Sequence, residues 1–332
     1  MSHPQPFDAA VVLDALGASL PPALVDPAMM EPLRAFAADL PAVWNWGMLE
    51  CRLAASDAAV DLLTCCSDVG PARAAMALAV DRGNLDLLAP GPARQVKAWS
   101  RSAAPVAASP QLWFEWETLA RAANNPLIWF GADAAFFEGP SAPPVDDPCA
   151  LALACLGQQV ADIAPFEPAV RRVQAALPEG GRLLGIGSLR PRGRNALRMF
   201  CALPDGGFSP WLQAIGWPGD LELAERHRAA ARAPLEPVFV QLEAEPELNP
   251  YLGIEARQTV QGFPSRRDRA SWLRFLCRDG LADRAKADAL LAWPGRSRLS
   301  DGRTLHRSFH IKVALRPDGP QAKGYLGFAA LG

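Results

Sequence analysis

The feature that most constrains the fold is a fivefold recurrence of paired strand-like segments. The pairs begin near Met48, Leu112, Leu183, Val238 and Phe309, so that about 55 to 71 residues separate one start from the next. Segments with helical periodicity fill each interval. A supersecondary unit that recurs at such a spacing indicates an architecture built by repetition. We therefore expect two strands followed by helices, five times over.

The last pair has the clearest pattern of a β-hairpin. Residues 305–315 alternate apolar with polar side chains, and a period of two places these on opposite faces of a strand. One face is apolar, and the other presents His310 and Lys312. Residues 316–321 contain two prolines and a glycine, which is the composition of a turn. The strand that returns over residues 322–328 then completes the hairpin.

Ten antiparallel strands have one compact arrangement that removes every sheet edge, which is a closed barrel with the helices packed outside. We therefore predict an α+β fold, a closed antiparallel ten-stranded β-barrel made of five ββ-hairpin/αα repeats. The chain is then one domain over residues 1–332, with an N-terminal helical segment at 1–46 and a Pro-rich loop at 139–148. If that loop instead separates two α+β domains, residues 1–138 should fold alone.

The side chains on the two faces of each hairpin agree with a barrel, because one face is apolar and the other carries charged residues. The apolar faces should meet helices, and a barrel of about ten strands leaves room inside for water and a ligand. The inward residues expected from this parity are Glu50, Arg52, Trp113, Glu115, Glu117, Arg198, Phe200, Phe239, Gln241, Glu243, Glu255, Arg257, His310, Lys312, Lys323 and Tyr325.

Bulk properties exclude several classes of protein. The formal net charge of −2 provides no basic surplus to neutralise nucleic-acid phosphates. No apolar run reaches the roughly 20 residues that cross a bilayer, and no signal sequence is visible. The seven cysteines have no CxxC spacing and the four histidines no HExxH motif, so we expect reduced thiols in a cytoplasmic protein and no metal site.

This layout resembles that of the ABBA-type prenyltransferases, whose ten-stranded PT barrel is ringed by helices. The closest local similarities are the Lys-x-Tyr of Lys323 and Tyr325 and the glycine-containing strand at 184–188 followed by the basic strand at 197–199. The resemblance implies a secondary-metabolism enzyme that transfers a prenyl group from an allylic diphosphate to an aromatic small molecule or a peptide side chain. The chain departs from the family in having only two tyrosines. It also lacks a DDxxD motif, which argues against a helical prenyl synthase.

Cationic side chains from several hairpins are candidates to bind the diphosphate, because a buried anion requires several charged donors. The alternative for them is pairing with glutamates or exposure to solvent. The candidate diphosphate-binding residues are Arg52, Arg198, Arg257, His310, Lys312, Lys323 and Tyr325.

Aromatic and acidic residues complete the predicted site. Aromatic faces stabilise an allylic carbocation by cation–π attraction, and a carboxylate can orient the acceptor and remove its proton. The aromatic candidates are Trp113, Trp129, Phe200 and Phe239, and the catalytic candidates are Glu115 first and Glu50 second. The alternatives are that the aromatic rings fill the barrel and that Glu115 pairs with an inward arginine.

The expected partners are a prenyl diphosphate and an aromatic or peptide acceptor, with neither nucleic acid nor a membrane span. No cofactor is assigned, although a magnesium ion could accompany the diphosphate. The rival hypothesis is a non-catalytic barrel that binds a peptide or metabolite as an accessory protein. The scarcity of tyrosine favours this rival, whereas the basic inward set favours the enzyme.

Overall fold

The computed structural model describes most of the chain. The described residues are 5–67, 71–84, 88–101, 109, 111–117, 126–131, 164–204, 206–231, 238–256 and 266–331. The Pro-rich loop at 139–148 and the predicted diphosphate ligand Arg257 lie outside them.

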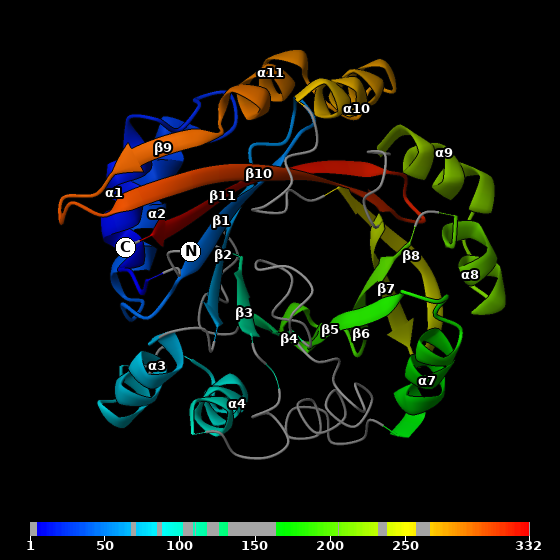
Figure 1. The fold of residues 1–332 in the computed structure, drawn as a ribbon, viewed down its shortest axis with the longest axis horizontal. Helices are drawn as coiled ribbons and strands as arrows, with labels where there is room; N and C mark the ends of the chain where they lie inside the picture. The colour runs from blue at the N-terminus through cyan, green and yellow to red at the C-terminus, as the bar shows by residue number, and fades with distance from the viewer. Residues whose placement is uncertain are drawn as a thin grey trace.

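Ten strands close into an antiparallel barrel, which confirms the predicted fold class (Figure 1). Each strand pairs with the next around the ring, β8 pairs with β10, and β11 pairs with both β10 and β1. The strands are β1 (Trp46–Arg52), β2 (Val60–Ser67), β3 (Gln111–Trp116), β4 (Leu127–Gly131), β5 (Arg182–Ser188), β6 (Leu197–Leu203), β7 (Val238–Glu245), β8 (Glu247–Ala256), β10 (Thr304–Leu315) and β11 (Gln321–Leu331).

A short further strand, β9 (Gly295–Arg298), lies outside the ring and is absent from the prediction. It pairs with the first four residues of β10, beyond the part of β10 that pairs with β8. Its sequence, Gly-Arg-Ser-Arg, has no apolar alternation. The strand therefore exists because β10 offers it a free edge, which a reading of local sequence does not detect.

Helices surround the barrel and cover its outer face (Figure 1). Four tryptophans of the outer layer are buried in the same apolar core as the outward-facing strand residues: Trp211, Trp217, Trp272 and Trp293. The helices are α1 (Ala9–Gly17), α2 (Pro27–Ala38), α3 (Ala72–Asp81), α4 (Pro90–Ser100), α7 (Glu167–Ala175), α8 (Phe208–Ala214), α9 (Leu221–Ala231), α10 (Arg266–Arg278) and α11 (Arg284–Ala292), with short 3-10 turns η2 (Ala164–Phe166) and η3 (Arg190–Arg192).

Aspartate caps begin several of these helices. The Asp8 carboxylate accepts a hydrogen bond from the Ala10 amide at 2.8 Å, and Asp26 caps α2 in the same way ahead of a proline at the first helical position. α8 begins at Phe208, one residue before Ser209, so Ser209 is not its N-cap. The Ser209 hydroxyl instead hydrogen bonds the Glu225 carboxylate of α9 at 2.6 Å.

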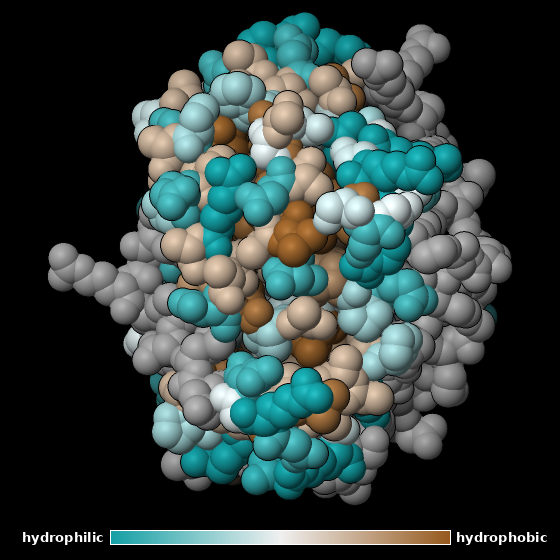
Figure 2. Space-filling model, turned by 90° about the vertical axis from the view of Figure 1, so that its left-hand side faces the viewer, coloured by the Kyte–Doolittle hydropathy of each residue, from teal (hydrophilic) through white to brown (hydrophobic). Residues whose placement is uncertain are grey.

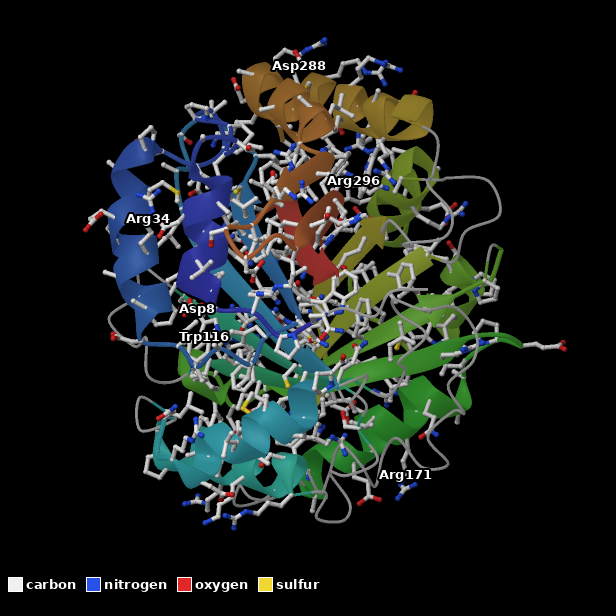
Figure 3. The ribbon with its side chains drawn as sticks, turned by 60° about the vertical axis from the view of Figure 1, so that its left-hand side comes forward. Asp8, Arg34, Trp116, Arg171, Asp288 and Arg296 are labelled. Carbon is white, nitrogen blue, oxygen red and sulfur yellow. The ribbon has the colours of Figure 1, made fainter. Side chains whose placement is uncertain are left out.

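The outer surface is polar. Charged residues such as Arg34, Arg171 and Asp288 project from the outer helices (Figure 3). On the face formed by the N-terminal helices and β9, hydrophilic side chains surround only small hydrophobic spots among the described residues (Figure 2). None of the helices in the described part of the chain has both the length and the hydrophobicity that crossing a bilayer requires.

The register of the barrel sets which side chains meet inside it. On the last hairpin, His310 lies opposite Tyr325 and Lys312 lies opposite Lys323. All four side chains are buried, as are the outward-facing Phe309 and its apolar neighbours. The predicted parity of this hairpin is therefore confirmed, and its polar face lines the lumen instead of solvent.

Candidate active site

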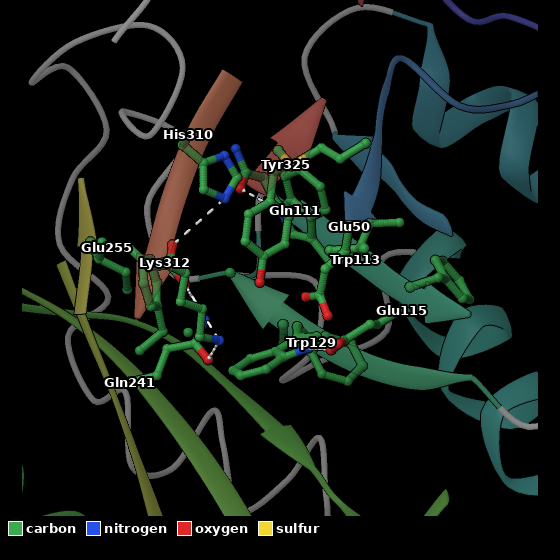
Figure 4. Close-up of a pocket in the computed structure, with 18 residues that line it drawn as sticks. Glu50, Gln111, Trp113, Glu115, Trp129, Gln241, Glu255, His310, Lys312 and Tyr325 are labelled. Atoms are coloured by element: carbon green, nitrogen blue, oxygen red, sulfur yellow. Dashed lines mark hydrogen bonds and ion pairs between the residues drawn. The ribbon is translucent and has the colours of Figure 1, made fainter. Parts of the chain in front are cut away.

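An inner chamber occupies the lumen of the barrel, with a cavity volume of about 80 Å³ (Figure 4). Carboxylates, aromatic rings and a lysine face it from different strands, so no single element forms the site. The polar and aromatic residues that line it are Glu50, Gln111, Trp113, Glu115, Trp129, Phe200, Gln241, Glu255, His310, Lys312 and Tyr325.

A second, more polar chamber of about 580 Å³ lies at the end of the barrel where β10 turns into β11. We call it the mouth chamber. Its charged lining consists mainly of arginines, with acidic residues among them. Its charged residues are Arg52, Glu117, Arg192, Arg194, Arg198, Glu243, Glu245, Arg316, Asp318 and Lys323.

A layer of ion pairs separates the two chambers. Lys323 Nζ donates to Glu50 Oε1 at 2.7 Å, and Arg52 bonds both Glu50 and, at 2.8 Å, Asp61. Burial alone raises the pKa of Glu50, but the positive charges of Lys323, Arg52 and Lys312 outweigh it and hold that pKa well below its usual range. Glu50 is therefore ionised and committed to two cations.

In the same layer, the pKa values of Lys323 and Asp61 are shifted toward the neutral forms of these groups. Burial lowers the pKa of Lys323 to about 8, although the Glu50 carboxylate opposes the shift. Burial, together with the negative charge of Glu50, raises the pKa of Asp61 to about 6 in spite of Arg52. Both shifts arise because the layer is dry and its charges are close together. Lys323 therefore changes charge state near pH 8, and Asp61 near pH 6.

Glu115 is held by Arg192, a residue of the η3 turn. Arg192 Nη2 lies 2.6 Å from Glu115 Oε1, and Trp129 Nε1 donates to the other carboxylate oxygen at 3.4 Å. Burial raises the pKa of Glu115, but the positive charges of Arg192, Arg198 and Lys323 together outweigh it and lower that pKa to about 2. Glu115 therefore pairs with an arginine, as the alternative interpretation of the sequence predicts.

Lys312 forms a second polar cluster deeper in the lumen. It donates to the Gln241 side-chain oxygen and lies 3.6 Å from Glu255, and Gln241 in turn donates to Glu255 at 2.6 Å. Lys312 fits because β8 has Gly253 next to it: an added Cβ at that position would lie 2.9 Å from Lys312 Cε. His310 Nε2 is 3.9 Å from Glu255, and its ring stacks on Tyr325 with centroids 4.0 Å apart.

Three of the four predicted aromatic residues, Trp113, Trp129 and Phe200, line the inner chamber. Phe239 does not line it but stacks behind Phe200, with ring centroids 5.9 Å apart and planes 8° from parallel. The Arg198 guanidinium lies 5.8 Å from the centroid of Trp129, which places a cation at the edge of the aromatic wall.

The predicted cationic set is divided between the chambers. His310, Lys312 and Tyr325 line the inner chamber, whereas Arg52, Arg198 and Lys323 line the mouth chamber. Lys323 reaches through the dividing layer to Glu50.

Sequence reasoning missed three residues of the site, Asp61, Arg192 and Gln111. Asp61 and Gln111 share the inward parity of β2 and β3 and were detectable from it. Arg192 lies in a turn, where no periodicity indicates its direction, and only the folded hairpin brings it to Glu115.

The site offers no preformed metal centre within the described residues, where no three histidine, cysteine or acidic side chains are grouped as metal ligands. A magnesium ion at this site would therefore need ligand atoms from the diphosphate itself.

Architecture and lumen together define a barrel of the ABBA type, the PT-barrel fold. Solved structures of prenyltransferases share it at low sequence identity. The ternary complex of the prenyltransferase PriB with L-tryptophan and dimethylallyl thiolodiphosphate is 13% identical with a TM-score of 0.56, and covers 97% of this chain and 96% of its own. The apo form of PriB is 12% identical with a TM-score of 0.55, at 97% and 94% coverage.

AnaPT from Neosartorya fischeri is similar over 86% of this chain and 78% of its own, with 16% identity and a TM-score of 0.50. No model of a known protein family and no curated protein matches the chain. At these identities the likeness establishes the fold, and function has to be argued from the residues of the lumen.

Proposed function

We propose that this protein is a prenyltransferase that binds an allylic diphosphate in the dividing layer of the lumen and transfers its prenyl group to an acceptor in the inner chamber. The observation that carries the proposal is the position of buried cations against an aromatic chamber: Lys312 and Lys323 lie on adjacent strands and point inward, and both are almost fully buried. Burying cations costs free energy unless an anion compensates for it. The PT-barrel fold of known prenyltransferases supports the same conclusion.

The diphosphate would be held where Arg52, Lys312 and Lys323 converge on Glu50, with Tyr325 and His310 as further donors. Charge-assisted hydrogen bonds to phosphate oxygens are about twice as strong as neutral ones. They would stabilise the negative charge that grows on the leaving group as the C–O bond of the prenyl donor breaks. Arg198 and Arg257 are assigned to the same role.

The prenyl group would then lie against the aromatic wall. Trp113, Trp129 and Phe200 present ring faces to the chamber, where they can stabilise an allylic cation and exclude water. Phe239 supports Phe200 from behind.

The acceptor would be oriented by the carboxylates of Glu115 and Glu50, which also can accept its proton. Both line the inner chamber, and both are held ionised by cations.

Calorimetry with dimethylallyl and geranyl diphosphate tests the prenyl-donor site. We expect the wild type to bind one of them and the double variant Lys312→Ala/Lys323→Ala to lose binding by at least ~100-fold, since two charge-assisted contacts disappear. Lys97→Ala on the outer face of α4 is the matched control and should bind normally. Unchanged affinity in the double variant would place the diphosphate elsewhere, and absence of heat with both diphosphates would oppose the enzyme.

A non-catalytic barrel that binds a peptide or metabolite is the second candidate. One observation favours it: Arg52, Arg198, Lys312 and Lys323 already have carboxylate partners, so these described cations are compensated without a diphosphate. Prenylated product, detected by mass spectrometry after incubation with a diphosphate and a peptide or aromatic acceptor, would eliminate this candidate.

A further inference from the structure

The balance of charge inside the barrel restricts the acceptor. In the described residues, five carboxylates and five cations lie in or against the two chambers, and each cation has an ion pair with one of the carboxylates. The carboxylates are Glu50, Asp61, Glu115, Glu243 and Glu255, and the cations are Arg52, Arg192, Arg198, Lys312 and Lys323. At the rim, Arg194 and Arg316 stand with Glu117, Glu245 and Asp318, so the described rim adds no surplus of positive charge.

A diphosphate that enters such a lumen brings several negative charges, and the five described cations inside it are already paired with carboxylates. It must draw Lys323, Arg52 or Lys312 away from the carboxylates that now hold them. Those carboxylates would then be left buried without a positive partner, which is strongly unfavourable. A positively charged second substrate is one way to restore the balance.

The inner chamber has the chemistry to recognise such a substrate. Three of the buried carboxylates, Glu50, Glu115 and Glu255, line it from β1, β3 and β8, and their exposed fractions are 1%, 5% and 2%. The polar groups around them are already engaged as donors: Trp113 to Gln111, Gln241 to Glu255, and Trp129 to Glu115. The chamber therefore offers acceptor oxygens to a ligand, whereas a carboxylate or phenolate ligand would meet repulsion.

The aromatic wall adds to the same preference. Trp113 and Trp129 face the chamber, and indole faces attract flat cations such as guanidinium. Arg198 already lies 5.8 Å from the Trp129 ring centroid, so that ring accommodates a guanidinium from the mouth side. Carboxylates and indole rings that line the same chamber match a planar N–H donor with positive charge.

We infer that the acceptor is a cationic nitrogen group, a guanidinium such as an arginine side chain or otherwise an alkylamine, seated among Glu50, Glu115 and Glu255. The inference rests on the proposed function and names its substrate class. In the reaction, a guanidinium nitrogen gives its proton to the Glu115 or Glu50 carboxylate and forms a bond to C1 of the prenyl group. The C1–O bond breaks, and its electron pair leaves with the diphosphate.

The inference also predicts coupling between the two substrates. The diphosphate takes cations from Glu50 and Glu255, and the guanidinium replaces them. Each ligand should therefore strengthen the binding of the other by the same factor.

Blocked arginine, N-acetylarginine methylamide, and its neutral isostere, the corresponding citrulline derivative, provide a matched pair of probes. Calorimetry in the presence of dimethylallyl thiolodiphosphate, which does not react readily, should give at least tenfold tighter binding of the arginine derivative. Without the diphosphate analogue, its affinity should fall at least several-fold. Blocked tryptophan and tyrosine complete the panel. With dimethylallyl diphosphate, mass spectrometry should find prenylated arginine.

The arms of this experiment separate the two proposals. If the diphosphate analogue binds but arginine and citrulline bind equally, or only the aromatic derivatives are prenylated, the cationic acceptor is refuted while prenyl transfer stands. If blocked arginine binds but no diphosphate does, prenyl transfer fails and the barrel is a receptor for guanidinium groups. If magnesium alone restores tight diphosphate binding and removes the arginine preference, the metal balances the charge and the inference is wrong.

Glu115→Gln locates the preference within the chamber. The substitution should reduce the ratio of arginine to citrulline affinity at least tenfold. Glu247→Gln, an exposed carboxylate that pairs with Arg172 outside both chambers, should leave that ratio unchanged. Equal ratios in the two variants would contradict the assignment of Glu115, and the wild-type panel remains decisive if Glu115→Gln fails to fold.

Discussion

At the scale of single residues, the charged side chains of the lumen form ion pairs, and each charge shifts the pKa of its partner. Lys323 is the most sensitive member, because burial weakens its hold on the proton while Glu50 strengthens it. An ammonium group with a pKa near 8 binds an anion only while protonated. The affinity for diphosphate that we propose for this site should therefore depend on pH near 8.

We expect the affinity of the wild type for dimethylallyl diphosphate to fall as pH rises through about 8, because the folded-state pKa of Lys323 is lowered to about that value and its charge is lost above it. Glu50, Arg52 and Glu115 interact with Lys323 and keep their charge over this interval. Calorimetry between pH 6.5 and 9.5 measures the profile. Lys323→Arg, which stays charged, should hold its affinity to higher pH; an identical profile in the two proteins would show that another group titrates.

At the scale of elements, the turns at the mouth are as important as the strands. Lys286 of α11 reaches the turn between β1 and β2, where its ammonium donates to the backbone carbonyls of Arg52, Ala54 and Asp57 at 2.5 to 3.0 Å. One helix on the outside of the barrel thereby fixes the turn that follows Arg52. The contact links the outer layer to the dividing layer of the lumen.

Lys286→Met should lower the free energy of unfolding by about 3 kcal/mol, because it leaves buried carbonyls without their charged donor. The substitution should also weaken diphosphate binding, since Arg52 loses its support. Urea denaturation and calorimetry provide the two readings. Arg284→Ala, on the same helix but exposed and paired only with Asp288, should change neither quantity. A Lys286→Met protein as stable as the wild type would show that water replaces the ammonium.

At the scale of the whole molecule, closure of the barrel makes the first and last strands depend on each other. β1 pairs with β11 over six residue positions, and β4 pairs with β5 across the segment that contains the Pro-rich loop. Neither half of the chain can satisfy its edge strands alone. We therefore interpret residues 1–332 as one folding unit.

A fragment of residues 1–138 should accordingly remain unfolded, because β1 lacks β11 and β4 lacks β5. The intact chain should unfold in one transition by both circular dichroism and tryptophan fluorescence. Dispersed amide signals in the NMR spectrum of the fragment would contradict this expectation and support two domains instead.

The sequence by itself determined the number of hairpins, the direction of each strand face and hence the closed barrel. This is because alternation of apolar and polar residues is a local property with a fixed period. It placed Glu50, Glu115, Lys312 and Lys323 inside for the same reason. Asp61 and Gln111 face inward by the same rule.

Only the tertiary structure decided how these side chains are combined. The pairing of Lys323 with Glu50 and of Arg192 with Glu115 joins positions that lie 273 and 77 residues apart, and such distances leave no local signal. The division into an aromatic inner chamber and an arginine-rich mouth also depends on strand register. Charge balance in the lumen is a sum over many strands, and it exists only after the barrel has closed.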